Sequence, residues 1–328
     1  MRSGGWQEAP LWGKADGLAG SSALAYALQQ ADNAFESRIS GARVAPERTV
    51  YPAVNAWTFA EDLPPEQQID VAAAAGFAGL ELVVSDSGPL QSHTSAERFA
   101  QLGRIAADAG IPVVGLATDL FWRFNYASRD EGDRRWAMEL TVRLLDRAAA
   151  GGAGAILVVP AVVGHPDDPR PQVSYADALN RTFDALLSLR HEAEMRGVVL
   201  AVENVWNRFL LSPVEFADLL DRVNSPYVGA YLDVGNVLAY GYPEDWIATL
   251  GRRIARVHVK DYDLARPGRA GFCPLGEGSV DWPAVVAALR AVRYDGPLTY
   301  EGAGDPRDIA RRLRNILAGR PPLAEESA

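Results

Sequence analysis

Eight short apolar runs, each followed by a segment with helical periodicity, constrain the fold of this chain more than any other feature. The apolar runs span residues 53–59, 79–84, 112–118, 155–160, 198–205, 228–234, 254–259 and 297–300. The helical segments span residues 66–75, 95–109, 134–149, 175–196, 213–223, 243–250, 282–291 and 305–317. Runs that are apolar on both faces, such as 156–159, are typical of parallel strands covered by helices. The alternation predicts an α/β fold, a closed (β/α)8 TIM barrel formed by a single domain.

An open, doubly wound sheet is the competing architecture for an alternating pattern of this kind. Its dinucleotide-binding form carries a Gly-x-Gly-x-x-Gly turn after the first strand. No such motif follows the first apolar run here. We therefore favour the barrel.

The two ends of the chain lack the alternating pattern. Residues 1–50 contain scattered Gly, Ser and Trp and one helical candidate at 21–35, and we expect an N-terminal extension whose role the sequence does not indicate. Residues 51–319 form the predicted catalytic barrel, and 48% apolar residues are enough for the core of one large domain. Residues 320–328 are predicted to be a flexible tail.

Charge and composition argue against several classes of partner. The formal net charge of −10 disfavours nucleic acid, which requires a basic face. No apolar stretch approaches the ~18 residues of a membrane helix, so no membrane partner is expected. Cys273 is the only cysteine, and residues 1–20 lack the pattern of a signal peptide. These features predict a cytoplasmic protein without an internal disulfide.

Four polar residues stand at the ends of consecutive predicted strands, where a barrel places its active site. They are Glu203, Asp233, His258 and Glu301, separated by 30, 25 and 43 residues. Each residue alone is more often a helix cap, a loop ion pair or a structural hydrogen bonder. Together, three carboxylates and one imidazole at one barrel mouth match a divalent cation, because three uncompensated acids are costly to bury.

The segments around these residues resemble the sugar phosphate isomerase/epimerase family of the xylose isomerase-like TIM barrel superfamily. The resemblance covers about residues 52–317 and rests on Glu203-Asn204-Val205-Trp206-Asn207, Asp233-Val234-Gly235-Asn236, His258-Val259-Lys260-Asp261 and Tyr300-Glu301-Gly302. It implies that Glu203, Asp233, His258 and Glu301 hold a divalent metal ion, with Mn expected and Co, Mg or Zn as alternatives. It also implies that Glu203 and Glu301 act as acid and base on the two faces of a sugar or sugar phosphate. Related barrels often pair, which implies a homo-oligomer, with a hetero-subunit partner as the alternative.

One position departs from part of that family. Many of its free-ketose epimerases carry a substrate-contacting His three residues after the metal-binding Asp, and this chain has Asn236 there. An Asn side chain can donate and accept hydrogen bonds but does not change charge near neutral pH. Asn236 therefore resembles the phosphate-sugar side of the family.

Further residues are predicted to contact substrate. Glu81, inside the second run, is expected to face it, although a buried, charge-balanced carboxylate would fit equally well. Lys260 and Asn236 lie beside the expected metal ligands, and Asp261 is expected to orient one of them. His165, after the fourth run, is a candidate second base, with an exposed loop histidine as the alternative. Three arginines are expected either to contact an anion such as a phosphate or to be solvated surface residues: Arg208, Arg266 and Arg269. Five aromatic residues are expected either to form the walls of a sugar site or to cap the barrel core: Trp57, Phe59, Phe121, Trp122 and Trp206.

Several reactions are compatible with such a site. The first expectation is a metal-dependent epimerase or isomerase of a ketose or ketose phosphate, working by carboxylate-mediated proton transfer through an enediolate. The alternatives are a dehydratase of the keto-inositol type and a lyase that cleaves 3-oxo-glycosides with His165 as base. A phosphate site would favour the epimerase, and a wide, aromatic-lined pocket would favour the lyase. Four histidines and the acidic charge disfavour a damaged-DNA endonuclease, and the intact ligand set disfavours a non-catalytic subunit.

Overall fold

The computed structural model describes residues 50–168 and 170–325. The chain divides into two units, Met1–Arg48 and Thr49–Ala328, and all described residues lie in the second unit. The predicted helix at 21–35 and the predicted extension at 1–50, apart from residue 50, therefore lie outside the described residues. In the part of the chain that is described, no helix combines the length and apolarity needed to cross a membrane.

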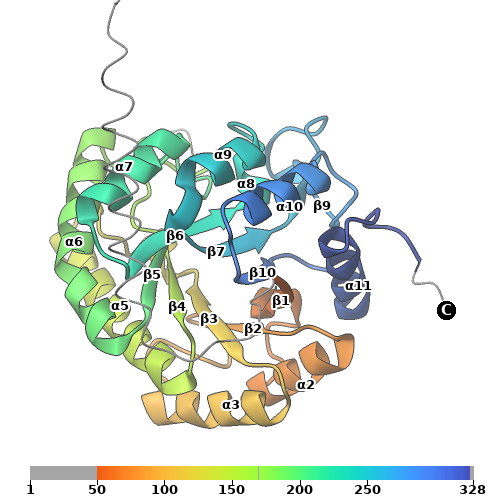
Figure 1. The fold of residues 1–328 in the computed structure, drawn as a ribbon. Coiled ribbons are helices and arrows are strands. Elements are labelled where there is room, and N and C mark those ends of the chain that lie inside the picture. The colour runs from red at the N-terminus through yellow and green to blue at the C-terminus, as the bar shows by residue number, and fades with distance from the viewer. Residues whose placement is uncertain (1–49, 169, 326–328) are drawn as a thin grey trace, which may run out of the picture. The chain divides into compact units, whose positions relative to one another are not determined.

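Eight parallel strands close into a barrel (Figure 1). In chain order they are β1 (Tyr51–Asn55), β2 (Leu80–Val84), β3 (Val113–Thr118), β4 (Ala155–Val158), β5 (Val199–Glu203), β6 (Val228–Asp233), β7 (Ile254–Val259) and β10 (Pro297–Tyr300). Each strand pairs with the strands before and after it in this series, and β10 pairs with β1 to close the ring. The predicted TIM barrel is confirmed, because pairing between the first and last strands excludes an open sheet.

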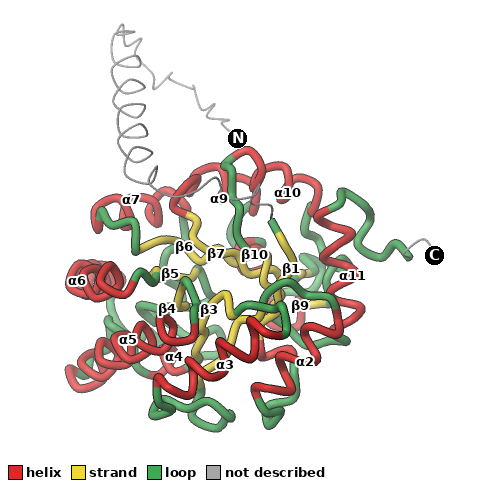
Figure 2. Tube along the Cα trace, turned by 60° about the horizontal axis from the view of Figure 1, so that its bottom comes forward, coloured by secondary structure: helices red, strands yellow, loops and turns green. Residues whose placement is uncertain are grey.

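Helices alternate with the strands and surround them (Figure 2). The longer ones are α2 (Pro65–Ala75), α3 (Ala96–Asp108), α5 (Glu131–Gly151), α6 (Tyr175–Arg196), α7 (Pro213–Val223), α9 (Pro243–Leu250), α10 (Trp282–Ala291) and α11 (Pro306–Leu317). Each overlaps one predicted helical segment. The hydroxyls of Ser174 and Ser212 accept hydrogen bonds from the first-turn N–H groups of Asp177 and Val214, and Gly197 ends α6 at a φ of 64°. Boundary signals in the sequence therefore determine where these helices begin and end.

Short elements at the strand ends add to the predicted pattern. β1 ends at Asn55, because the Asn55 side chain accepts a hydrogen bond from Trp57 N–H and begins a 3-10 helix, η1 (Ala56–Thr58). Two four-residue helices, α4 (Leu120–Arg123) and α8 (Val234–Val237), lie just after β3 and β6. The segment after β7 forms an antiparallel hairpin. The remaining short elements are η2 (Gly251–Arg253), β8 (Asp261–Tyr262), η3 (Gly268–Gly271) and β9 (Phe272–Cys273).

The C-terminal residues differ in part from their expectation. A flexible tail is predicted over 320–328, but its described part, 320–325, packs on α11. The Asn315 side chain is fully buried, and its amide donates to the carbonyl oxygens of Pro322 and Ala324 at 3.2 and 2.8 Å. Because a buried amide needs partners, these bonds hold the segment against the helix.

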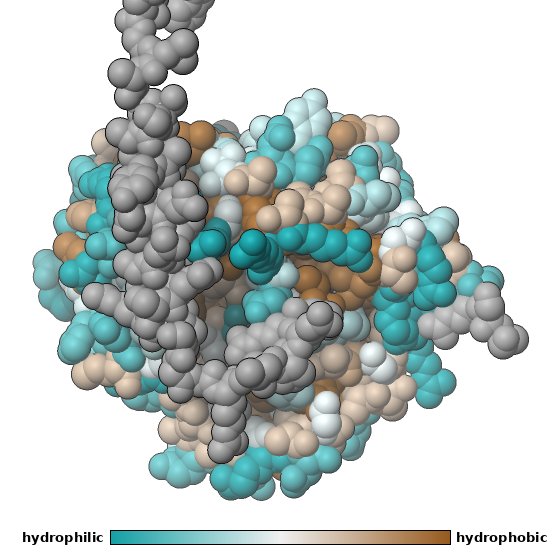
Figure 3. Space-filling view, in the orientation of Figure 1, coloured by the Kyte–Doolittle hydropathy of each residue, from teal (hydrophilic) through white to brown (hydrophobic). Residues whose placement is uncertain are grey.

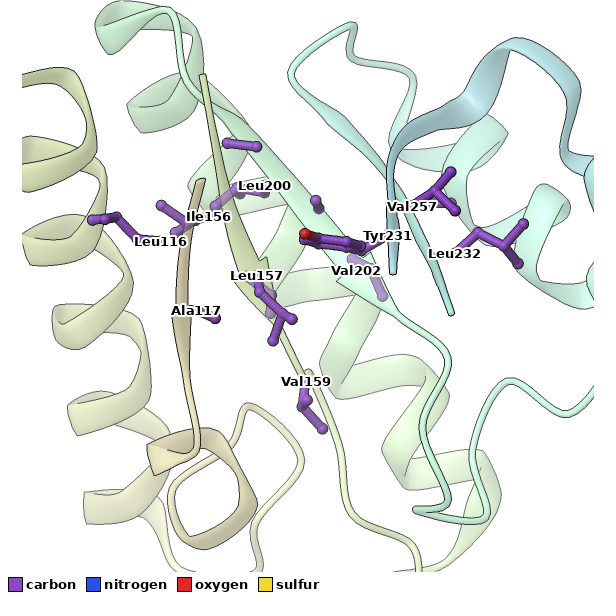
Figure 4. Close-up of a cluster of buried hydrophobic side chains, with 14 of the residues drawn as sticks. Leu116, Ala117, Ile156, Leu157, Val159, Leu200, Val202, Tyr231, Leu232 and Val257 are labelled. Carbon is purple, nitrogen blue, oxygen red and sulfur yellow. The ribbon is translucent and has the colours of Figure 1, made fainter. Parts of the chain in front are cut away.

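Alternating strand side chains separate the barrel interior from the helix-facing layer. Figure 4 shows the Tyr231 ring lying between the strands, whereas Leu116 and Leu232 point outward toward the helices. All three side chains are at most 1% exposed. Since side chains two residues apart on a strand share a face, Asp233 at the end of β6 points the same way as Tyr231. The core thus positions strand-end residues toward the mouth of the barrel.

Candidate metal centre

The four strand-end residues converge at the carboxyl ends of the strands. Glu203 ends β5, Asp233 ends β6, His258 lies in β7 and Glu301 follows β10 directly. One potential ligand atom from each residue lies within 4.8 Å of the corresponding atoms of the others. Strand register contributes to this arrangement, because Asp233 and His258 are paired residues on adjacent strands.

The chemistry of this group fits a divalent cation. It offers three carboxylates and one imidazole, donors that suit Mn and the neighbouring divalent metals. Three of the side chains are buried, with exposures of 5% for Glu203 and 0% for Asp233 and His258, and Glu301 is partly buried at 19%. Burying carboxylates together requires a positive charge among them. These residues could therefore hold a metal ion.

His258 is hydrogen-bonded through both ring nitrogens. Its Nδ1 lies 3.2 Å from Glu203 Oε1 and 3.6 Å from Glu301 Oε2. Its Nε2 lies 2.7 Å from Oε2 of Glu81, a fully buried residue. Glu81 also accepts hydrogen bonds from Asn55 Nδ2 at 2.6 Å and from the Tyr231 hydroxyl at 2.9 Å. Nδ1 is therefore the nitrogen that faces the other candidate ligands.

Lys260 supplies a positive charge to the group. Its Nζ lies 2.8 Å from Asp233 Oδ2 and also forms an ion pair with Glu301 Oε2. It lies 5.4 Å from the centroid of the Phe272 ring, within the range of a cation–π contact. Lys260 therefore pairs with two of the candidate metal ligands and also contacts an aromatic side chain beside them.

Burial and neighbouring charges separate the pKa values of the carboxyl groups. Burial raises the pKa of Glu203 to about 7, with the hydrogen bond from His258 opposing the rise and the charge of Glu301 adding to it. Burial would also raise the pKa of Glu301, but the charges of Lys260 and His258 outweigh it and lower that pKa to about 2. Burial raises the pKa of Asp233 in spite of Lys260. A bound cation would favour the ionised form of all three groups.

A hydrogen-bonded network ties the ends of β5 and β6 together. Asn204 donates to the Asp233 carbonyl at 3.0 Å and accepts from Asp233 N–H at 2.8 Å. Asn236 donates its side-chain amide to the Asn204 carbonyl at 3.1 Å, and its N–H donates to Asp233 Oδ1 at 2.9 Å. The Trp206 indole donates to the Asn236 carbonyl at 3.2 Å. These bonds fix the carboxylate of Asp233 relative to β5.

A cavity of about 220 Å³ opens over the group. Its lining includes eight residues expected at the site from the sequence: Glu203, Glu301, Trp57, Trp122, Trp206, Asn236, Lys260 and Arg269. The other lining residues are Thr118, Leu157, Val159, Pro166, Val205 and Phe272. Four aromatic side chains thus line one small cavity. Figure 3 shows hydrophobic residues beside a band of hydrophilic ones on the face seen in Figure 1.

Six residues expected at the substrate do not line this cavity: Glu81, His165, Arg208, Arg266, Phe59 and Phe121. Glu81 is fully buried and bonded to His258, as in the charge-balanced alternative. His165 stacks on Trp122, with ring centroids 5.2 Å apart, and lines a neighbouring pocket. Arg208 is exposed, with a φ of 58°, and is not among the cavity residues. The positions of His165 and Arg208 depend on the paths of their loops, which the sequence does not specify.

Asp261 was expected to orient a metal ligand, but its carboxylate instead binds backbone and side-chain groups of the segment after β7. Its carboxylate accepts hydrogen bonds from the N–H groups of Tyr262, Gly276 and Val280 and from the Trp282 indole, at 2.8–3.2 Å. A Cβ at Gly278 would come within 2.2 Å of Asp261 Oδ1. Asp261 therefore anchors the segment after β7, which carries Arg269 and Phe272 to the cavity.

Sequence reasoning overlooked several residues of the centre. Asn55 ends β1, but the predicted first run continued to residue 59 and so placed Asn55 inside the strand. Tyr231 lies two residues before Asp233 and could have been assigned to the interior by the two-residue period of a strand. Phe272 lies in a hairpin that has no strong strand pattern, and no signal in the sequence indicated it.

Comparison with known proteins identifies the family. Residues 69–320 match the family model for the xylose isomerase-like TIM barrel. The chain is 26% identical over 249 residues to the putative L-ribulose-5-phosphate 3-epimerase SgbU of Escherichia coli, covering 74% of this chain and 85% of that protein. It is 30% identical over 217 residues to the 2-epi-5-epi-valiolone 7-phosphate 2-epimerase of an Actinoplanes species, covering 65% and 73% of the two chains.

Solved structures share the fold. A D-tagatose 3-epimerase-like protein superposes with a TM-score of 0.67 at 19% identity, over 82% of this chain and 97% of that one. The family match spans most of the barrel and contains all four residues of the carboxylate–histidine group. This chain belongs to the xylose isomerase-like TIM barrel family.

Proposed function

We propose that this chain is a sugar epimerase that requires a divalent metal ion and moves protons on a ketose or ketose phosphate. The observation that carries the proposal is the convergence of Glu203, Asp233, His258 and Glu301 to within 4.8 Å beside a cavity of about 220 Å³. Both curated relatives described above are named as epimerases, which supports the reaction class.

The two glutamates suit a two-base mechanism. When bound, a divalent cation supplies Lewis-acid polarisation of the substrate carbonyl. Glu203 ends β5 and Glu301 follows β10, and β6 and β7 lie between these two strands in the ring. A substrate held between them presents a different face to each carboxylate. One carboxylate takes the proton from the carbon beside the carbonyl, leaving an enediolate, and the other returns a proton to the opposite face, which inverts that centre.

The cavity walls suit a small sugar. Trp57, Trp206 and Phe272 offer apolar surface that excludes water and can pack on the face of a sugar. Arg269 lines the same cavity and gives a phosphate group a cationic contact. Asn236 offers its side chain at the position where related free-ketose epimerases carry a His.

A 3-oxo-glycoside lyase is the second candidate, because four aromatic side chains line the cavity. Its expected base, His165, instead lines the neighbouring pocket that shares Trp122 as a wall. The acid and the base of the proposed epimerisation, Glu203 and Glu301, both line the metal-site cavity, and this makes it the preferred reaction. Release of a free aglycone from a 3-oxo-glycoside would distinguish the lyase.

Hydrogen exchange tests the proposal directly. Protein loaded with Mn²⁺ is incubated in D₂O with free ketoses and ketose phosphates, and deuterium at carbon is followed by NMR. Exchange at the carbon beside the carbonyl is expected, and it should disappear with a chelator and in Glu301→Gln. Glu194→Gln, on the exposed face of α6, is the matched control and should exchange like the wild type. If the protein is shown to hold Mn²⁺ but exchanges carbon-bound hydrogen on none of the substrates, the proposal is overturned.

A further inference from the structure

Lys260 places a cation among the proposed metal ligands. Its Nζ pairs with carboxylate oxygens of Asp233 and Glu301, two of the four residues that would hold the ion. The Lys260 side chain is 18% exposed and also lines the cavity. The ammonium therefore stands between the ligand group and the space that a substrate would enter.

The surroundings are shaped for this lysine. A Cβ at Gly235 would come within 2.5 Å of Lys260 Cγ and 2.7 Å of the Lys260 carbonyl oxygen. Gly235 belongs to the Asp-Val-Gly-Asn segment that begins with the candidate ligand Asp233. Phe272 faces the ammonium from the hairpin after β7. Two separate segments therefore leave room for the lysine or contact it, beyond the carboxylates themselves.

We propose that Lys260 is a place-holding cation. It compensates Asp233 and Glu301 until a divalent ion binds, and it is then displaced into the cavity, where its ammonium can meet a substrate oxygen. Asp233 Oδ2 and Glu301 Oε2 are within direct ion-pair range of the ammonium, and a divalent ion on the same oxygens would repel it strongly. The flexible four-carbon stem of lysine permits the displacement, and the adjoining cavity gives the ammonium a destination.

This role couples metal binding to substrate binding. Without metal, the ammonium is occupied by two carboxylates, and with metal it becomes available to the substrate. The inference rests on the proposed function for the identity of the ligand group, but metal binding itself can be measured without turnover.

The test is calorimetric titration of Mn²⁺ into the metal-free wild type and into Lys260→Met. Removal of a competing cation is expected to tighten Mn²⁺ binding at least about tenfold. The metal-free variant should melt at a lower temperature than the wild type, because its carboxylates lose their compensation. The rise in Tm on adding Mn²⁺ should then be larger in the variant. Equal or weaker Mn²⁺ binding in Lys260→Met would overturn the proposal.

Two control variants separate charge from shape. Arg269→Met removes a cation that lines the same cavity but pairs with Asp167 at 3.1 Å, so its Mn²⁺ affinity should stay within about twofold of wild type. Lys260→Arg keeps the charge and should bind Mn²⁺ no more tightly than wild type. Tightening in Lys260→Arg equal to that in Lys260→Met would overturn the proposal, because charge would then not be the cause.

A second measurement tests the proposal if Lys260→Met does not fold without metal. The variant is then purified with Mn²⁺, and loss of the ion to excess chelator is followed with time. Slower loss than from the wild type supports the proposal, and faster loss overturns it. Failure of the proposed function would look different: the wild type would bind Mn²⁺ and show the Lys260 effect, yet exchange no carbon-bound hydrogen.

Discussion

The Nε2 atom of His258 and the Oε2 atom of Glu81 lie 2.7 Å apart, although 177 residues separate the two in the sequence. Both side chains are fully buried, and they come from β7 and β2. A carboxylate that accepts one ring N–H of a histidine fixes its tautomer and orientation. Glu81 thereby directs Nδ1 of His258 toward Glu203 and Glu301, which gives this carboxylate a positioning role.

Replacing Glu81 should weaken metal binding. Glu81→Gln keeps the volume of the side chain but removes the charged acceptor, and Mn²⁺ affinity is expected to fall about 10- to 100-fold by calorimetry. The matched control is Glu215→Gln, a carboxylate on α7 that accepts a hydrogen bond from Tyr175. Unchanged Mn²⁺ binding in Glu81→Gln together with a raised KM would instead assign Glu81 to the substrate.

Replacing Glu203 should affect chemistry and metal binding together. Glu203→Gln loses a carboxylate that both lines the cavity and belongs to the ligand group. Loss of a general base is expected to lower kcat about 10²- to 10⁴-fold, and titration should show weaker Mn²⁺ binding. Full activity in this variant would remove the mechanism proposed for the two glutamates.

Removing the metal should lower thermal stability. An ion that binds only the folded state at about 100 times its Kd adds roughly 2.7 kcal/mol. For a barrel of this size that corresponds to a Tm change of roughly 5 °C. Differential scanning calorimetry with chelator, and again after Mn²⁺ is restored, measures the change. Asp233→Asn, which loses a ligand, should show little response, and an equal response there would place the ion elsewhere.

Trp57 should contribute to substrate binding without supporting the fold. It is 36% exposed and lines both the metal-site cavity and a neighbouring pocket. Trp57→Ala is expected to raise KM about tenfold with little change in Tm, since about 1–2 kcal/mol of apolar contact is lost only in the complex. Leu187→Ala, with a similar exposure of 37% on α6, should leave KM unchanged. A fall in kcat with constant KM would argue against a binding wall.

Replacing Asp308 by Asn should lower the free energy of unfolding by an amount that depends on pH. Burial would raise the pKa of Asp308, but hydrogen bonds and charge from Arg311 and Arg312 outweigh it and lower the pKa. A lowered folded pKa means that stabilisation is present above the unfolded pKa of roughly 3.9 and is lost as the pH falls through the folded value. Because the side chain is 37% exposed and screened by solvent, Asp308→Asn should cost at most about 1 kcal/mol at pH 7.

Urea unfolding of the wild type and Asp308→Asn at several pH values measures this difference. The two curves should converge at acidic pH, below the folded pKa of Asp308. Asp70→Asn, an exposed residue on α2, serves as the control. A difference that persists undiminished in acid would assign the effect to packing and not to charge.

The order of strands and helices could be read from the sequence because its causes are local. Apolar runs, helical periodicity and capping residues such as Ser212 act within a few residues of one another. The convergence of Glu203, Asp233, His258 and Glu301 also followed, because the strand ends of a closed parallel barrel meet at one mouth. Residues that end their own strands therefore came together without any knowledge of side-chain contacts.

Contacts across the barrel were decided only by the tertiary structure. The sequence left Glu81 open as a substrate contact or a buried, charge-balanced carboxylate, and its bond to His258 depends on the register of strands on different sides of the ring. Lys260 reaches Asp233 and Glu301 because Gly235 leaves space for its stem. Asp261, like Lys260, follows β7, but its carboxylate accepts a hydrogen bond from Gly276 in the segment after that strand. Which partner a polar side chain finds depends on distances between segments far apart in the chain, and packing alone determines those distances.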